Sequence, residues 1–155
     1  EILRCLVGSE MCIRDRSIMM LFENNYYRTS DYLLDIEFLF VDLGTSTGWR
    51  IYILSDIEYK QFSASRSDSI TTIHRLTEYN SDMLRKINTF QRNKGRIASD
   101  STPIHYICWK YKIDSLERAR EIAKTWSEIT AYYIRNGGSF ESIQPKLKRK
   151  GIIKL

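Results

Sequence analysis

The residues with the clearest capacity for chemistry are two histidines and one cysteine: His74, His105 and Cys108. Imidazole and thiolate groups bind metal ions, and a cysteine beside a histidine can act as a nucleophile. His105 and Cys108 are three positions apart in a segment expected to be a strand, so their side chains point to opposite faces and cannot share an ion. We therefore expect no metal site, no cofactor and a small buried Cys108 beside Trp109. A Cys108–His74 dyad stays open, because sequence does not show which residues are neighbours in space.

Basic side chains offer a second chemistry, the binding of phosphate groups. Residues 17–84 carry five basic and ten acidic side chains, whereas residues 85–155 carry sixteen basic and six acidic ones. A basic half can bind a polyanion such as nucleic acid, or it can neutralise the acidic half within one fold. The candidate nucleic-acid-binding residues are Arg66, Arg75, Arg92, Lys94, Arg96, Lys146, Lys148, Arg149 and Lys150. Tyrosine and tryptophan side chains are available to stack on bases.

The stretch FVDLGTSTG, residues 40–48, resembles the first phosphate-binding hairpin of the actin, sugar-kinase and heat-shock-chaperone ATPases. The resemblance implies that Asp42 orients a metal-bound water and that Gly44, Thr45 and Ser46 bind phosphate oxygens. The strand order also resembles the start of a ribonuclease H-like fold, which would make Asp42 a metal carboxylate, with Asp82 and Asp114 available beside it. The alternative is a hairpin loop that uses these residues for its turn.

Alternating apolar residues predict the strands that must position these groups. In residues 33–43 the side chains of Leu34, Ile36, Phe38 and Phe40 share one face, and Leu39 and Val41 suggest that the other face is covered too. Residues 49–54 complete an antiparallel hairpin with them. Residues 69–76 and 104–112 are expected to be further strands, and residues 24–27 a frayed end or an edge strand.

Apolar residues at helical spacing predict helices over residues 81–90 and 116–136. Asp114 and Glu117 resemble a capping box for the longer helix. Pro145 is expected in the first turn of a short basic helix. These elements predict the α+β class: a small antiparallel sheet of three to four strands packed against a long C-terminal helix, with a short inserted helix. We expect one domain over residues 17–140 and a basic C-terminal tail over residues 141–155.

Residues 1–16 include LVGSEMCIRDR and resemble the translation of a transposon-end adapter used for sequencing libraries. On this interpretation they are not native, they should pack poorly, and the natural start is Met19, Met20 or a lost upstream residue. Cys108 is then the one native cysteine. An internal disulfide is excluded in that case, which favours the cytoplasm.

The spaced segments WRIYIL, HRL, YICW and SLERAREIAKTWSEITAYYIRNG, within residues 49–140, resemble a group of small bacterial proteins. The resemblance implies that HRL and YICW are neighbouring antiparallel strands and that residues 77–103 are an insertion. It implies no activity. We expect a bacterial, cytoplasmic binding or accessory module without an active site, whose partner is a protein or a polyanion and not a membrane. The alternatives are a nucleic-acid-binding protein and a phosphate- or metal-dependent enzyme that uses Asp42.

Overall fold

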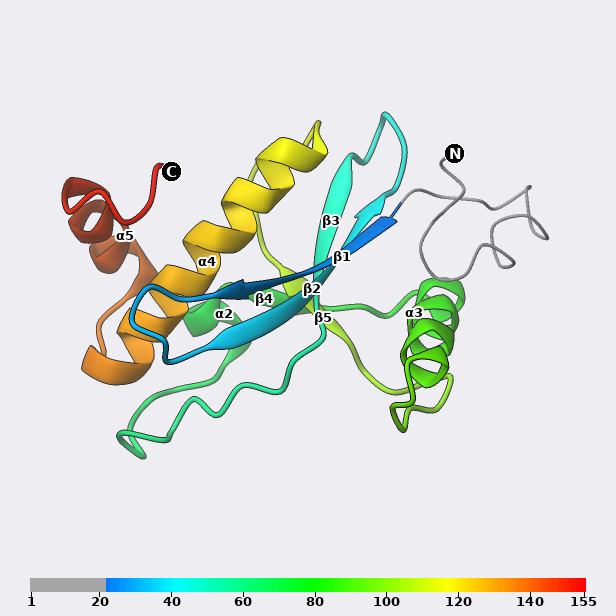
Figure 1. The fold of residues 1–155 in the computed structure, drawn as a ribbon, viewed down its shortest axis with the longest axis horizontal. Helices are drawn as coiled ribbons and strands as arrows, with labels where there is room; N and C mark the ends of the chain where they lie inside the picture. Colours follow the sequence, from blue (N-terminus) through cyan, green and yellow to red (C-terminus); the bar gives the residue numbers. More distant parts are fainter. Residues whose placement is uncertain (1–21) are drawn as a thin grey trace.

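Five antiparallel strands form one sheet in the order β1-β2-β3-β5-β4 (Figure 1). The computed structural model describes residues 22–155, so the adapter interpretation and the start at Met19 or Met20 lie outside the described residues. The elements are β1 (Phe22–Arg28), β2 (Asp35–Asp42), β3 (Trp49–Ile53), α2 (Ile70–Ile73), β4 (Arg75–Thr77), α3 (Ser81–Asn93), β5 (His105–Ile107), α4 (Leu116–Asn136) and α5 (Phe140–Arg149). The α+β class is confirmed.

The central strand β2 is covered on both faces, as its sequence predicts. Ile36, Phe38 and Phe40 belong to a buried cluster that includes the apolar stripe of α4. The ring of Phe38 meets that of Trp126 edge to face, with centroids 6.4 Å apart. Leu39 and Val41 belong to a second buried cluster that includes residues of α3. Burial on both faces explains why this strand is apolar at nearly every position.

The sheet has five strands, whereas three to four were expected. Residues 24–27 lie within the edge strand β1, which pairs with β2 along its whole length from Phe22↔Val41 to Arg28↔Asp35. The hairpin of β2 and β3 is also present, with Phe38↔Ile53 and Asp42↔Trp49 as the outer pairs.

Residues 69–76 do not form the strand that their β-branched composition predicts. The Ser69 side chain accepts a hydrogen bond from the backbone N–H of Thr72 and caps the one-turn helix α2. His74 then takes a left-handed conformation, φ 50° and ψ 52°, which ends that helix. The strand β4 begins only at Arg75. The local cap therefore outweighs β propensity, which is a weak and context-dependent preference.

Residues 104–112 form a shorter strand than expected, because β5 covers only His105–Ile107. Its neighbour β3 pairs with it only at Tyr52↔Tyr106 and Ile53↔His105, so the residues after Tyr106 have no partner on β3. The antiparallel pairing of the HRL and YICW segments is confirmed by Arg75↔Ile107 and Leu76↔Tyr106. The chain after Ile107 leaves the sheet and contributes to the cleft described below.

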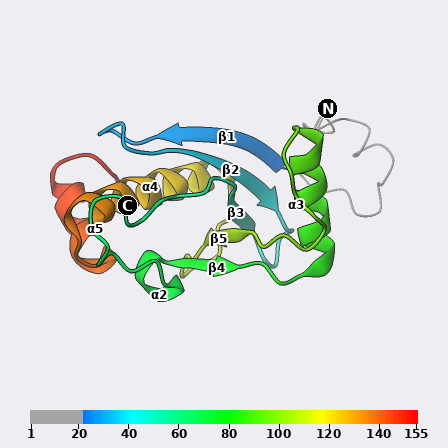
Figure 2. The same ribbon diagram turned by 90° about the horizontal axis from the view of Figure 1, so that it is seen from below.

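The segment after α4 is a packed helix. Phe140, Ile143, Leu147 and Ile153 are buried against the core that α4 shares with the sheet. Ser139 caps α5 in a capping box with Ser142, so the helix starts five residues before Pro145 and the proline lies inside it rather than in its first turn. Figures 1 and 2 show α5 beside α4, at the end of the molecule opposite α3. Residues 141–155 thus contribute apolar side chains to the core as well as basic side chains to the surface.

The long helix α4 has the predicted bounds and a different cap. The side chain of Ser115, not Asp114, accepts the hydrogen bond from the backbone N–H of Arg118. We expect Ser115→Ala to lower the free energy of unfolding by about 1 kcal/mol, the usual contribution of a serine N-cap. Asp114→Ala is the matched control, with an expected loss below about 0.5 kcal/mol. Urea denaturation of both variants measures the difference, and equal losses would contradict the assigned cap.

Candidate functional site

A cleft of about 280 Å³ opens where the end of β5, the middle of α4 and the start of α5 meet. It is lined by His74, Ile107, Cys108, Trp109, Lys110, Tyr111, Thr125, Trp126, Ile129, Phe140, Glu141 and Gln144. Apolar and aromatic side chains make up much of this lining, together with the polar or charged residues His74, Lys110, Thr125, Glu141 and Gln144. This composition is typical of a small-ligand site.

The polar group of greatest interest in this cleft is the Thr125 hydroxyl. Thr125 is 1% exposed, and its Oγ1 has no hydrogen-bond partner among residues 22–155. The neighbouring Trp126 is satisfied, because its indole N–H donates to the Ile73 carbonyl at 2.9 Å. A buried hydroxyl without a partner costs free energy, and a ligand in the cleft that bonds to it would recover that cost.

His74 stands at one wall of the cleft in a fixed orientation. Its Nε2 lies 3.0 Å from Oε2 of Glu141, and its ring stacks on Phe140 with centroids 4.9 Å apart and planes 8° from parallel. His74 also has a positive φ, which is uncommon for residues other than glycine. These contacts tie α5 to the start of β4.

Cys108 is exposed, so the expectation of a small buried residue is wrong. Its backbone N–H donates to the His74 carbonyl at 2.9 Å, beside the Arg75↔Ile107 pair of the β4–β5 ladder. The side chain is exposed at the point where the chain leaves the sheet after Ile107. Cys108 and His74, the possible dyad that the sequence left open, therefore line the same cleft. The partner of His74 Nε2 is Glu141, however, and not the thiol.

His105 lies apart from this cleft. Its Nδ1 is 3.2 Å from the Thr77 hydroxyl across the β4–β5 ladder. Burial lowers the pKa of His105 below its ordinary value, and the positive charge of Arg75 lowers it further. Within residues 22–155, no group of three or more histidine, cysteine, aspartate or glutamate side chains is placed to hold a metal ion.

The residues of the expected phosphate loop form a hairpin turn. The carboxylate of Asp42 accepts a hydrogen bond from the Gly44 N–H at 2.9 Å, and the Thr45 carbonyl accepts one from Lys112 Nζ at 2.7 Å. Thr45 and Ser46 are exposed turn residues. Asp82 is paired on the surface with Arg85 at 2.8 Å, so Asp42 and Asp82 serve separate local structures.

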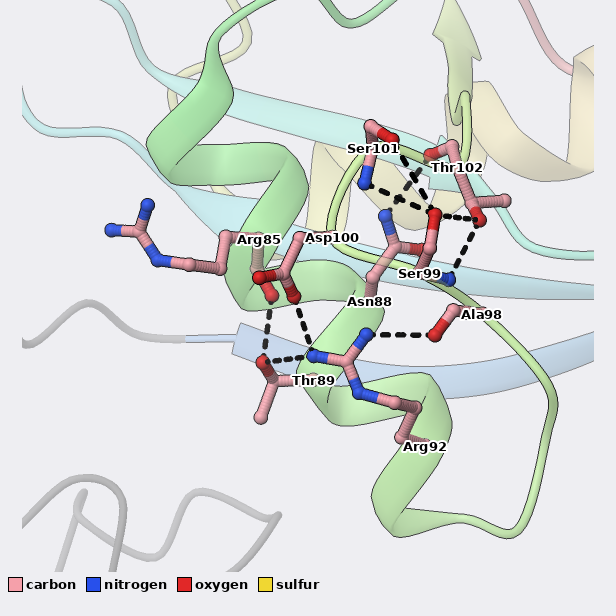
Figure 3. A network of polar contacts seen from close by, with 9 residues as sticks. All are labelled: Arg85, Asn88, Thr89, Arg92, Ala98, Ser99, Asp100, Ser101 and Thr102. Atoms are coloured by element: carbon pink, nitrogen blue, oxygen red, sulfur yellow. Dashed lines mark hydrogen bonds and ion pairs between the residues drawn. The ribbon is translucent and has the colours of Figure 1, made fainter.

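Five of the nine candidate nucleic-acid-binding residues lie outside α5, and each of them contacts other groups of the chain. Lys94 and Arg96 pair with the buried Glu37, and Arg75 lies over the ring of Tyr59. Arg92 donates to the Ala98 carbonyl and pairs with Asp100, within the network drawn in Figure 3. Arg66 donates to the carbonyls of Ile134 and Arg135 at the end of α4.

The other four candidates lie on α5 and just after it. Lys146 lies over the ring of Tyr132, while Lys148, Arg149 and Lys150 are exposed. Because α5 and α3 are at opposite ends of the molecule (Figures 1 and 2), the lysine and arginine residues after α3 do not continue this group. The structure therefore divides the candidates into separate groups.

Comparison with protein-family models, with curated proteins and with solved structures finds no match. None of the helices between residues 22 and 155 combines the length and apolar character that crossing a bilayer requires. The cleft between β5, α4 and α5 is therefore the candidate functional site. Sequence reasoning did not single out Thr125, Glu141 or Gln144 there. The available signal was weak: a threonine beside the apolar stripe of α4, next to Trp126.

Proposed function

We propose that the protein is a binding module and that it holds a small, flat, largely apolar molecule in the cleft between β5, α4 and α5. The observation that carries this proposal is the Thr125 hydroxyl, buried beside an apolar cleft without a hydrogen-bond partner among residues 22–155. This function belongs to the binding or accessory class that the sequence favours.

The cleft indicates the chemistry of the ligand. Ile107, Trp126 and Ile129 present apolar surface, and the Thr125 hydroxyl can both donate and accept a hydrogen bond. A cavity of about 150 Å³ holds benzene, so the volume of about 280 Å³ suits two fused aromatic rings. The expected ligand is an aromatic molecule with one hydroxyl or carboxyl group.

The walls of the cleft are held by contacts that do not involve a ligand. The Trp126 indole N–H donates to the Ile73 carbonyl, the His74 ring stacks on Phe140, and Gln144 Nε2 donates to the Leu155 carbonyl at 2.8 Å. A site that is formed before the ligand arrives avoids an ordering cost on binding. This arrangement supports a binding role for the cleft.

A matched pair of probes, 2-naphthol and naphthalene, tests the proposal. We expect the full chain to bind 2-naphthol about five- to tenfold more tightly than naphthalene, the value of one added hydrogen bond in a buried site. We expect Thr125→Val to remove this preference while still binding both molecules. Chemical shifts of backbone amides, followed during titration, give both the affinity and the location.

Thr130→Val is the matched control. Thr130 is also on α4, is also buried and also has an unpartnered hydroxyl, but it does not line the cleft. We expect this variant to keep the full preference for 2-naphthol. Equal affinity of the unsubstituted chain for the two probes, or shifts confined to residues outside the cleft, would contradict the proposal.

A further inference from the structure

The last nineteen residues of the sequence carry a strong excess of positive charge. Residues 137–155 contain five basic side chains and one acidic side chain, which leaves a net charge of +4. All five basic side chains are exposed, and we call them the α5 basic surface: Lys146, Lys148, Arg149, Lys150 and Lys154. The one acidic residue, Glu141, lies 3.0 Å from His74 and does not pair with any of them.

The ion pairs of lysine and arginine within residues 22–155 all lie outside the α5 basic surface. The paired cations are Arg28, Arg50, Arg85, Arg92, Lys94, Arg96, Arg120 and Arg135. On the α5 basic surface, Lys146 contacts the ring and the hydroxyl of Tyr132 instead of a carboxylate. The carbonyl end of a helix carries about half a negative charge, which is too little to offset a net charge of +4. This part of the surface therefore attracts an anionic partner.

The packing of α5 fixes the direction of the basic positions on the helix. Its apolar residues Phe140, Ile143 and Leu147 are buried against the core. The lysine and arginine residues between and after them are thereby placed on the solvent side. Figures 1 and 2 show α5 at one end of the molecule, beside α4, so a large partner has access to it.

The chain after α5 turns back along the helix and adds Lys154 to the same surface. The Ile152 N–H donates to the Leu147 carbonyl at 3.0 Å, and the Gln144 side chain donates to the Leu155 carbonyl at 2.8 Å. These bonds hold the backbone on both sides of Lys154. A fixed array of cations loses less conformational entropy on binding than a flexible basic tail does.

The composition of this surface favours nucleic acid over a membrane or a protein. The large apolar side chains of residues 137–155 are buried or half-buried, and none is exposed. A helix that binds a bilayer surface inserts an apolar face, and a protein interface depends on aromatic or aliphatic anchors. The phosphate backbone of a nucleic acid requires only cations, and a DNA duplex presents one negative charge in about 1.7 Å of its length.

We propose that the α5 basic surface binds the phosphate backbone of double-stranded DNA without preference for base sequence. Four of its five cations are lysines, which bind phosphate as point charges and read no base edges here. RNA duplexes are recognised partly through their 2′-hydroxyl groups, but the polar side chains of Ser142 and Gln144 are already bonded within the chain. The inference is independent of the proposed function, because none of the five cations lines the cleft.

Fluorescence anisotropy of a labelled DNA duplex of about 20 base pairs, titrated with the full chain, tests the proposal. We expect the logarithm of the association constant to fall linearly with the logarithm of the salt concentration. The slope should be about −4.5 if all five cations contact phosphates. Two duplexes of unrelated sequence should bind equally. An absence of binding at about 50 mM salt, or a tenfold preference for one sequence, would overturn the proposal.

A triple variant with Lys148→Gln, Arg149→Gln and Lys150→Gln tests the location. We expect its affinity to be at least about tenfold lower at low salt and its slope to be less steep by about 3. The matched control carries Lys60→Gln, Lys86→Gln and Arg118→Gln, which removes the same residue types from the loop before α2, from α3 and from α4. We expect the control to lose less than about threefold in affinity. An unchanged urea midpoint shows that each variant folds, and equal losses in the two would show that total charge, not the α5 basic surface, binds the DNA.

Three competitors separate DNA from other anionic partners. Vesicles that contain phosphatidylserine, polyglutamate and an RNA duplex of the same sequence are each added at a charge concentration equal to that of the labelled DNA. We expect the vesicles and polyglutamate to displace little of the labelled DNA, and the RNA duplex to bind no more tightly than the DNA. Stronger binding of any competitor would assign the α5 basic surface to that class of partner and overturn its assignment to DNA.

Discussion

Replacing Glu37 with alanine is expected to lower the free energy of unfolding by about 2–3 kcal/mol at neutral pH. The Glu37 carboxylate is 4% exposed and accepts from Arg96 at 2.5 Å and from Lys94 at 3.2 Å. Asn24 Nδ2 donates to the same carboxylate at 2.9 Å and to the Phe38 carbonyl at 3.0 Å. The loss should fall at or below the low end of the range for broken buried pairs, because both cations are about one-third exposed and can turn to water.

The same carboxylate makes stability depend on pH. Burial by itself raises the pKa of Glu37, but hydrogen bonds from Asn24 and the two cations outweigh burial and bring that pKa below its ordinary value of 4.5. A group whose pKa is lower in the folded chain stabilises the fold above its unfolded pKa and loses that contribution as the pH falls through the folded pKa. The difference in unfolding free energy between the unsubstituted chain and Glu37→Gln should therefore be constant near neutral pH. It should shrink below about pH 4.5.

Arg96→Ala tests the same buried pair from the side of the cation, and Arg85→Ala is its matched control. Arg96 pairs with the buried Glu37, whereas Arg85 pairs with the exposed Asp82 one helical turn away. We expect a loss of about 2 kcal/mol for Arg96→Ala and less than about 0.5 kcal/mol for Arg85→Ala. Urea denaturation of the unsubstituted chain and the four variants at several pH values measures these differences. Equal losses for the two arginine variants would show that the Glu37 pair contributes no more than a surface pair.

Replacing Gly48 with alanine is expected to cost about 3 kcal/mol or more. Gly48 has φ +80°, and a Cβ atom there would lie 2.3 Å from the Ile113 carbonyl oxygen and 2.8 Å from Lys112 Cγ. The carbonyl belongs to the backbone and cannot move aside cheaply, so strain of about 1–3 kcal/mol from the backbone adds to the steric clash. The Gly48–Ile113 bridge also anchors the segment that carries Lys110 and Tyr111 to the cleft, so weaker probe binding should accompany the loss.

Gly44→Ala separates backbone strain from the clash. Gly44 has φ +101°, but a Cβ atom there meets nothing within 4 Å. We expect a loss of about 1–2 kcal/mol, which is the cost of a left-handed conformation alone. Thermal and urea denaturation of the two variants, measured together, give the difference. If Gly48→Ala is no more destabilising than Gly44→Ala, the close approach of the Ile113 carbonyl does not constrain this turn.

Much of the fold follows from patterns that neighbouring residues carry. The stripe that includes Ala119, Ile122 and Trp126 repeats at helical spacing, and α4 has the bounds that this stripe predicts. The alternation in β2 likewise assigns Phe38 and Leu39 to opposite sides of the sheet, where the structure has them. Predictions failed where one side-chain contact outweighs propensity, as at Ser69, whose cap turns an expected strand into a helical turn.

The candidate site was much less predictable, because it depends on which distant segments meet. His74 and Cys108 were considered as a pair from sequence, but no pattern connects either of them to Thr125 on α4 or Glu141 on α5. Basic residues could be counted from sequence, but their acidic partners could not be assigned. Lys94 pairs with Glu37, which is distant in the chain.

The sequence by itself determined two features of this protein that do not depend on contacts between distant segments. They are the antiparallel hairpin of β2 and β3 and the amphipathic helix α4. Both arise from hydrophobic periodicity, which is a property of consecutive residues and of the side that each must bury. Only the tertiary structure decided that Cys108 is exposed, that the Thr125 hydroxyl lies at a cleft, and which cations are paired. Burial and pairing depend on contacts between segments far apart in the chain, and no local pattern records which segments pack together.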